Sequence, residues 1–174
     1  MSLNTIDKAI ESVIAWQVGK ASAAGFVTGL GGLITLPAAI PANFASVAYI
    51  QLRMITCIAH LRGYDIRSDQ VKTMAFACLC GTQVTNLLKD AGVQIAQKLT
   101  YNFIMKQIPR ELLYNINRAV GFRLVTKAGT TGIINIVRVV PGIGGIVNAS
   151  VDGAVTRVIG RAAKSVFNDQ AREC

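Results

Sequence analysis

The chain has 174 residues, of which 52% are hydrophobic and only 16% charged, and its formal net charge is +9. Its length fits one domain. A basic, apolar chain favours an anionic membrane surface or an acidic protein as its partner. Nucleic acid is not expected, because the sequence lacks the interleaved aromatics of single-strand binders and any recognition-helix or zinc-finger pattern.

Residues 1–24 are predicted to form an amphipathic N-terminal helix. Isoleucines recur along it at four-residue steps, at Ile6, Ile10 and Ile14, and the charged residues lie off this apolar stripe. The pattern is typical of a helix packed against a core, and a helix lying on a membrane surface is the alternative. The first residues lack the basic stretch and apolar run of a secretory signal, so we expect a cytoplasmic protein.

Residues 25–41 form the most distinctive stretch of the chain. No charged residue occurs in residues 21–52, and glycines and prolines punctuate this uncharged run. Two of the glycines have the four-residue spacing that lets helices touch backbone to backbone, whereas prolines interrupt regular helix. We therefore predict a helix–corner–helix hairpin, with its second helix over residues 41–62. The hairpin residues are Gly25, Gly29, Gly31, Gly32, Pro37 and Pro41.

The length of the uncharged run bears on whether it spans a membrane. A spanning helix needs about 20 consecutive apolar residues, and the glycines and prolines divide this run into shorter arms. We therefore expect no straight span there. Two interpretations remain. One is a tight hairpin buried within a helical domain, which we favour; the other is a re-entrant hairpin that enters one leaflet and is shielded by protein.

The middle of the chain is predicted to be helical in several pieces. Residues 63–68 form a polar connection, and Ser68 or Asp69 can cap a helix that follows over residues 69–88. A further segment reaches about Lys106. Beyond it we expect a break at the Gly-Thr-Thr-Gly stretch and three short helices. Those helices are predicted over residues 111–117, 118–128 and 133–140.

A second Gly/Pro-rich corner precedes the last helix, which is predicted over residues 146–167. Three basic residues on that helix, Arg157, Arg161 and Lys164, stand at i, i+4 and i+7 and form a stripe on one face. The stripe is either a solvated face or a site for anionic head groups or an acidic partner. The hairpin residues of this corner are Pro141, Gly142, Gly144 and Gly145. The expected inward stripe consists of Val147, Val151, Ala154, Val158, Ala162 and Phe167.

Patterns for catalysis, cofactors and metals are incomplete, and we predict no catalytic residue, metal or cofactor. The glycine stretches lack the residues that complete a dinucleotide fingerprint or a P-loop, and Cys78-x-Cys80 has no second ligand pair. Asp152 lies inside an apolar run, and a buried carboxylate must be paired or hydrogen-bonded. We therefore expect a structural polar cluster, which could act as an enzyme site only if it converged on an open cavity. Its candidate members are Arg53, His60, Asp65, Arg138 and Asp152.

Several short stretches carry a family resemblance. They are LPAAIP at 36–41, QLRM at 51–54, IAHLRGYD at 58–65, CLCG at 78–81, INRAVGFR at 116–123, TKAG at 126–129, GIIN at 132–135, VPGIGG at 140–145 and IGRAA at 159–163, with Asp152. Together they resemble the EcsC family over nearly all of the chain after about residue 25. The family is bacterial, helical and hydrophobic. The resemblance implies an all-α domain linked to membranes and carries over no catalytic residues.

We therefore predict an all-α protein: a compact bundle of about six to eight helices with two Gly/Pro-rich helix–corner–helix hairpins. The single domain, residues 1–174, comprises the N-terminal helix 1–24, a family-like core 25–168 and a tail 169–174. We expect a non-enzymatic module at the inner face of the cell membrane, bound to anionic lipid or a membrane protein. The alternative is a soluble regulatory protein, for example an antitoxin-like partner, that recognises an acidic protein. A homo-oligomer is compatible with both.

Overall fold

The computed structural model describes residues 3–30, 36–93, 99–137 and 143–168. Within these residues every regular element is a helix, and the helices form a compact bundle, which confirms the predicted fold class. The elements are α1 (Leu3–Leu30), α2 (Leu36–Leu61), α3 (Asp69–Cys78), the 3₁₀ turn η2 (Gly81–Gln83), α4 (Val84–Asp90), the π-helical turn η3 (Phe103–Gln107), α5 (Arg110–Val137) and α6 (Ile143–Val166).

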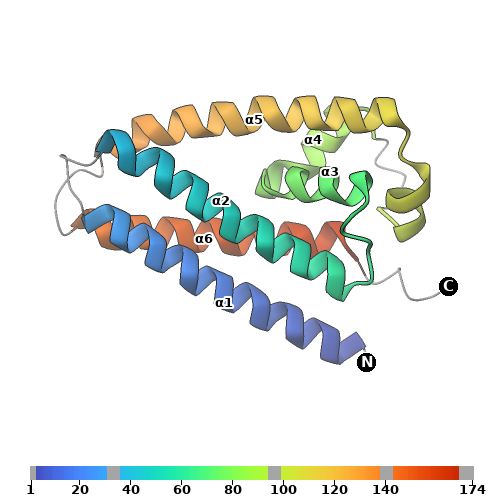
Figure 1. Cartoon of the computed structure of the whole chain (residues 1–174), viewed down its shortest axis with the longest axis horizontal. Coiled ribbons are helices and arrows are strands. Elements are labelled where there is room, and N and C mark those ends of the chain that lie inside the picture. The colour runs from blue at the N-terminus through green and yellow to red at the C-terminus, as the bar shows by residue number, and fades with distance from the viewer. Residues whose placement is uncertain (1–2, 31–35, 94–98, 138–142, 169–174) are drawn as a thin grey trace.

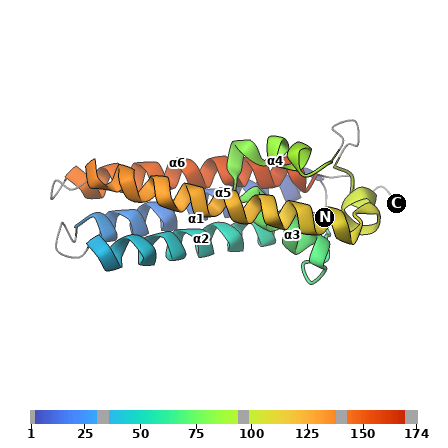
Figure 2. The same cartoon turned by 90° about the horizontal axis from the view of Figure 1, so that it is seen from above.

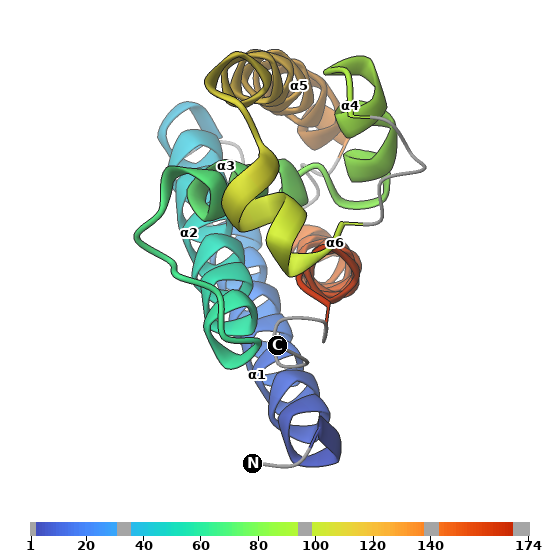
Figure 3. The same ribbon diagram turned by 90° about the vertical axis from the view of Figure 1, so that its right-hand side faces the viewer.

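The long helices α1, α2, α5 and α6 run lengthwise through the molecule (Figure 1). α1 packs along α6 and α2, whereas α5 lies on the far side of the bundle and contacts α3 and α4. The short elements fill the region beside α5 at one end, as the perpendicular view in Figure 2 also shows. Seen end-on in Figure 3, α1 and α5 lie on opposite sides, with α2 and α6 between them.

Four helix termini lie together at one end of the bundle. At the end that we call the connector end, α1 stops at Leu30, α5 stops at Val137, and α2 and α6 begin at Leu36 and Ile143. α1 and α2 pack side by side with opposite directions, as expected for a hairpin. The corners themselves lie outside the described residues. This applies to the predicted hairpin residues Gly31, Gly32, Pro141 and Gly142.

The prolines of the first hairpin lie inside α2 rather than before it, which corrects the predicted helix start at Pro41. α2 begins at Leu36, so Pro37 lies in its first turn and Pro41 in its second. A proline in the first turn loses no intrahelical hydrogen bond, because the first N–H groups of a helix have no partner. The missing N–H of Pro41 removes only the bond to the Pro37 carbonyl, at the edge of a long helix.

The hairpin glycines are helical as well. Gly25 and Gly29 lie within α1, which continues to Leu30 rather than ending at residue 24, and Gly144 and Gly145 lie within α6. Helical glycine costs about 1 kcal/mol relative to alanine. Long helices that pack against neighbours can absorb that cost, so glycine alone does not end them.

The helix break predicted at residues 129–132 is absent, and a different glycine interrupts a helix. α5 is one continuous helix through residues 129–132, where three short helices were predicted. By contrast, the helix predicted over residues 69–88 is divided, because Gly81 has φ +61°. This left-handed conformation is incompatible with continued α-helix and is accessible to glycine at little cost.

The core is built from both large and small side chains. Ile6, Ile10 and Ile14 of α1 are buried, as their spacing predicted, and they pack into one cluster with residues of α2, α3 and α6. The inward face of α6 differs from the predicted stripe, since Ala154 is exposed. Among the residues of α6 whose burial is described, the buried ones are Gly153, Thr156, Ile159, Gly160, Ala163 and Val166.

Two glycines of α6 allow α1 to approach closely. A Cβ atom added at Gly160 would lie 2.9 Å from Ile14 Cγ1, and one added at Gly153 would collide with the Ser22 hydroxyl. The backbones therefore approach at two positions one heptad apart, which we call the glycine seam. Helix packing through glycine had been predicted from the first corner, but the seam lies on α6.

Candidate functional site

Three of the proposed polar-cluster residues are exposed, so the buried cluster expected from the sequence does not form around them. Arg53 and His60 lie on the outer face of α2, and Asp65 is exposed in the turn after it. Asp152 is half-buried in α6. Arg138 lies outside the described residues. Groups that face solvent separately offer no shared cavity for a reaction.

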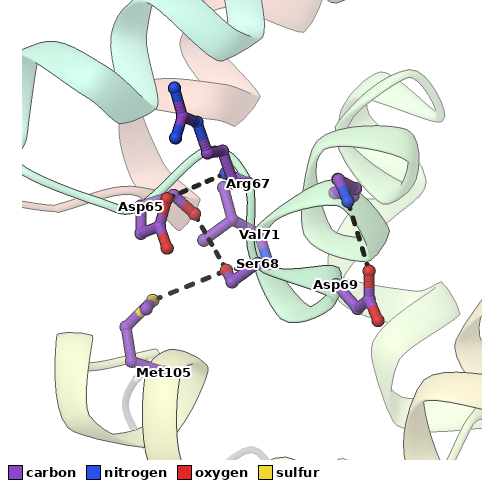
Figure 4. Close-up of polar contacts among 7 residues, drawn as sticks. Asp65, Arg67, Ser68, Asp69, Val71 and Met105 are labelled. Atoms are coloured by element: carbon purple, nitrogen blue, oxygen red, sulfur yellow. Dashed lines mark hydrogen bonds and ion pairs between the residues drawn. The ribbon is translucent and has the colours of Figure 1, made fainter.

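Asp65 organises the turn from α2 to α3 (Figure 4). The Arg67 backbone N–H donates to its carboxylate at 2.9 Å, and the Ser68 hydroxyl donates to its backbone carbonyl at 2.8 Å. The same hydroxyl accepts from the Val71 N–H at 3.3 Å. Of the two predicted candidates, Ser68 rather than Asp69 is thus the N-cap of α3, and it satisfies one of the otherwise unpaired N–H groups of the helix start. These roles are structural.

The predicted basic stripe of α6 is divided between two environments. Arg157 and Arg161 are exposed. The Lys164 ammonium, farther along α6, lies 3.1 Å from an Asp7 carboxylate oxygen and 3.0 Å from a Glu11 oxygen. Two of the three predicted contact residues therefore remain available to an anionic surface, while the positive charge of the third is compensated within the fold.

The acidic side chains of α1 form an ionic network with the C-terminal ends of α2 and α6. The guanidinium of Arg62 donates to Asp7 at 2.9 Å, and the Arg62 side chain is only 3% exposed. Hydrogen bonding from Lys164, together with the charge of Arg62, holds the pKa of the Asp7 carboxyl below its ordinary value, although partial burial acts in the opposite direction. Hydrogen bonds to Glu11 and Asp7 raise the pKa of Lys164. The network fixes the end of the bundle opposite the connectors.

A buried tyrosine lies at the same end. The rings of Tyr101 and Phe167 are each 5.1 Å from the Tyr64 ring, centroid to centroid. Burial raises the pKa of the Tyr64 hydroxyl to about 12, with a contribution from Tyr101. Tyr64 therefore stays protonated at physiological pH, and its contacts are those of a packing residue.

One buried polar pair joins α2 to α6 between the two ends. The Gln51 amide nitrogen donates to the Thr156 hydroxyl at 3.1 Å, and both residues are buried. Reasoning from the sequence missed this pair and the burial of Arg62. The only signal was weak: a lone polar residue on an otherwise apolar helical face, as Gln51 is.

The connector end carries exposed apolar side chains. Phe26 and Val27 of α1, Phe44 of α2 and Ile146 of α6 are between 37% and 67% exposed. The segments that meet there include the charge-free residues 21–52. The ionic network lies at the opposite end, where Leu3 and Ile66 are also exposed, so among the described residues the two ends differ in charge rather than in exposed apolar side chains.

Aromatic and basic groups lie between these two ends. Trp16 and Tyr49 are each 67% exposed. The Lys20 ammonium lies 5.1 Å from the centre of the Trp16 ring, close enough for a cation–π interaction. Tyr49 is followed one helical turn later by exposed Arg53. Exposed aromatics beside long basic side chains form surfaces that are apolar at one edge and charged at the other.

One described helix has the length and composition to cross a membrane. It is α2, over Phe44–Leu61, and a third of that window is buried within the protein. Core helices of other proteins share this property, and α2 also carries Arg53 and His60. The finding therefore gives little support to a span and fits a helix that packs on one face and is exposed on the other.

Comparison with known proteins identifies the family. The family model described as "EcsC protein family" matches residues 1–169, a range that includes α1. No curated protein and no solved structure matches the chain. The family match covers nearly the whole length and agrees with the resemblance drawn from the short stretches above. The chain belongs to the EcsC family.

Proposed function

We propose that this protein is a non-enzymatic, membrane-associated helical module that attaches to an anionic membrane surface on the cytoplasmic side. One observation carries the proposal: exposed apolar side chains of three helices lie together at the connector end of a bundle whose net charge is +9. Exposed apolar patches of this kind mark interaction surfaces. A membrane offers both an apolar interior and negative head groups, so it complements both properties at once.

The free energy gained by burying the exposed apolar side chains in lipid can be estimated. Complete burial of a large apolar side chain contributes about 1.5–3 kcal/mol, so burying the exposed part of Phe26, Val27, Phe44 and Ile146 contributes roughly 1 kcal/mol each. A dissociation constant of 1 mM corresponds to about 4 kcal/mol. Arg138 lies between α5 and α6 in the sequence, and an arginine carried to the bilayer centre costs about 2.5–3.5 kcal/mol. The connector end alone therefore gives weak attachment.

Basic residues supply the remaining attraction. Each lysine or arginine near an anionic leaflet contributes about 1 kcal/mol, and exposed Arg157 and Arg161 lie on the same face of α6. Attachment that combines both terms depends on ionic strength but does not vanish at high salt. This mixed salt response distinguishes the proposal from a purely electrostatic contact with an acidic protein, for which the connector end has no role.

Vesicle co-sedimentation tests the proposal. Wild-type protein is mixed with neutral phosphatidylcholine vesicles or with vesicles containing phosphatidylglycerol, at low and at high salt. We expect binding to the anionic vesicles that weakens, without disappearing, at high salt. In Arg157→Gln/Arg161→Gln, binding should fall roughly 10–30-fold, since two charges at about 1 kcal/mol each are removed.

The control variant removes the same charge elsewhere. Arg110→Gln/Arg118→Gln replaces two exposed arginines of α5 and should change binding less than threefold. If both double variants lost vesicle binding equally, the loss would be due to net charge alone and not to the position of the arginines on α6. Absence of binding at both salt concentrations would refute membrane attachment, and capture of one acidic protein by vesicle-inactive wild type would favour the soluble alternative.

A further inference from the structure

The glycine seam fixes the relative height of residues on α1 and α6. These helices run in opposite directions, and the seam places Ile14 of α1 against Gly160 of α6. Counting along both helices from this contact brings Trp16 level with Arg157, to within about one residue's rise of 1.5 Å. An exposed tryptophan and an exposed arginine on neighbouring helices therefore share one height in the bundle.

The Gln51–Thr156 hydrogen bond extends this register to α2. α2 and α6 run in the same direction, so the bond brings Arg53 level with Arg157 and Tyr49 slightly closer to the connector end. Three helices thus present aromatic and basic side chains within about one to two helical turns of each other. We call this set the girdle. It consists of Trp16, Lys20, Tyr49, Arg53 and Arg157.

The composition of the girdle is that of a membrane–water interface. Tryptophan and tyrosine concentrate at the head-group level of membrane proteins, where one edge of the ring meets lipid and the other meets water. Lysine and arginine extend their charged ends toward water from positions near the interface. The contact of Lys20 with the Trp16 ring combines both features at a single site.

The distance from the girdle to the connector end matches one leaflet. At 1.5 Å per residue, about 21 Å of helix separates Trp16 from Leu30, and about the same length separates Arg157 from Ile143. Half of a bilayer measures about 15 Å of hydrocarbon, or about 20–22 Å with its head groups. A bundle with the girdle at the head groups therefore reaches the bilayer midplane without crossing it.

We propose that the bundle stands upright in one leaflet, with the connector end inserted to about the midplane and the girdle at the head groups. This inference rests on the proposed membrane attachment and specifies its geometry. The side chains on the lipid side are the exposed Phe26, Val27, Phe44 and Ile146. Asp152, which is half-buried, is the charged residue nearest the girdle on that side within the described part of α6.

The opposite end cannot take this place. Asp7, Glu11, Arg62 and Lys164 are held together there by ion pairs, and exposed Lys8 lies beside them on α1. Inserting these groups into hydrocarbon would strip water from several charges. If the bundle instead lay flat on α6, Arg161 and Arg157 would lie equally close to the lipid. The girdle residues on α1, α2 and α6 would then lie at different depths.

Trp16 allows a direct test, because it is the single tryptophan of the chain. Full-length protein is bound to phosphatidylglycerol-containing vesicles whose lipids carry bromine at a shallow or a deep acyl position. Trp16 fluorescence should be quenched more strongly by shallow than by deep bromine. In Trp16→Phe/Phe26→Trp the order should reverse. In Trp16→Phe/Ser165→Trp, which reports on exposed Ser165 near the opposite end, neither lipid should quench.

Binding is measured separately by co-sedimentation of the same samples, so the two proposals can fail independently. If protein that sediments with vesicles is quenched at Ser165→Trp as strongly as at Phe26→Trp, or more strongly, the bundle lies flat or inverted, and the upright geometry is then wrong while attachment stands. Equal quenching of Trp16 by shallow and deep bromine would likewise contradict the girdle depth. Protein that does not sediment refutes both proposals.

A matched pair of substitutions tests the inserted end by affinity. Phe26→Ser should reduce binding at high salt about five- to tenfold, because electrostatic attraction is screened there and apolar contact dominates. Tyr114→Ser removes an exposed aromatic near the start of α5, at the opposite end, and should change binding less than twofold. If Phe26→Ser instead turned a dimer into a monomer and left vesicle binding unchanged, the connector end would be a contact between two copies, and insertion would be refuted.

Discussion

Replacing Gly160 with alanine tests whether the glycine seam determines how α1 sits on α6. The added Cβ would lie 2.9 Å from Ile14 Cγ1 and 3.2 Å from both Cδ1 and Cγ2 of the same side chain. Ile14 is buried, and a β-branched side chain in a helix has essentially one χ1 rotamer. It cannot rotate away, so one of the two helices must shift.

The size of the effect follows from two opposing terms. Alanine in a helix interior is favoured over glycine by about 0.8–1 kcal/mol, and overpacking a well-filled core costs about 1–3 kcal/mol. Gly19→Ala supplies the matched control, because Gly19 is an exposed glycine of α1 and a Cβ added there would meet no atom within 4 Å. The free energy of unfolding of Gly160→Ala should therefore lie about 1–3 kcal/mol below that of Gly19→Ala.

Urea unfolding followed by circular dichroism measures this difference, with equal m-values required for the comparison. Ile14→Ala removes the three atoms nearest to the new Cβ, so its cost, about 2–5 kcal/mol in wild type, should shrink in the Gly160→Ala background. Stabilisation of Gly160→Ala equal to that of Gly19→Ala, or additive costs in the double variant, would show that the seam does not constrain α1.

Three further outcomes follow from the polar contacts. Thr156→Val should cost about 1–3 kcal/mol because it leaves the buried Gln51 amide unsatisfied; adding Gln51→Leu should recover part of that loss in urea unfolding. Asp7→Asn should lower the free energy of unfolding by about 0.5–1 kcal/mol at pH 7, because the side chain is 40% exposed. Since the folded-state pKa of Asp7 is lowered, its contribution is present above about pH 4 and lost as pH falls further, so wild type and variant should converge in acid unfolding series. Ser68→Ala should cost about 0.5–2 kcal/mol of stability, and Ser68→Asp much less, if the hydroxyl acts as the N-cap of α3.

The elements predicted correctly are those whose signals are local. The four-residue spacing of Ile6, Ile10 and Ile14 predicted the buried face of α1, and Ser68 was one of two residues predicted to begin α3. Breaks were predicted less well because glycine only weakens a helix. Residues 129–132 remained helical, while Gly81 ended a helix through its positive φ. Composition does not distinguish these two uses of glycine, since the choice depends on packing partners.

The environments of the candidate site residues depend on contacts between distant parts of the chain, which the sequence does not reveal. Arg62 is buried because Asp7, 55 positions away, accepts its hydrogen bond, and Lys164 is compensated by residues of α1 rather than of its own helix. A periodic pattern places a side chain on a face but does not identify the opposing helix. The basic stripe was therefore predicted as a unit, although only Arg157 and Arg161 remain exposed.

The distribution of small and large core residues along the bundle fits an end that works in lipid. Near the connector end, Ala21 and Gly25 are the buried residues among those of α1 whose burial is described, and α6 contributes Gly153 to the same region. Toward the charged end the core is filled by residues such as Ile6 and Phe167. Apolar burial drives helices together in water, but in hydrocarbon the lipid is as apolar as leucine, and association relies on close contact between small residues. Under the proposed insertion, the connector end would be held by packing that persists in lipid, and the opposite end would keep the large apolar core and ion pairs that stabilise proteins in water.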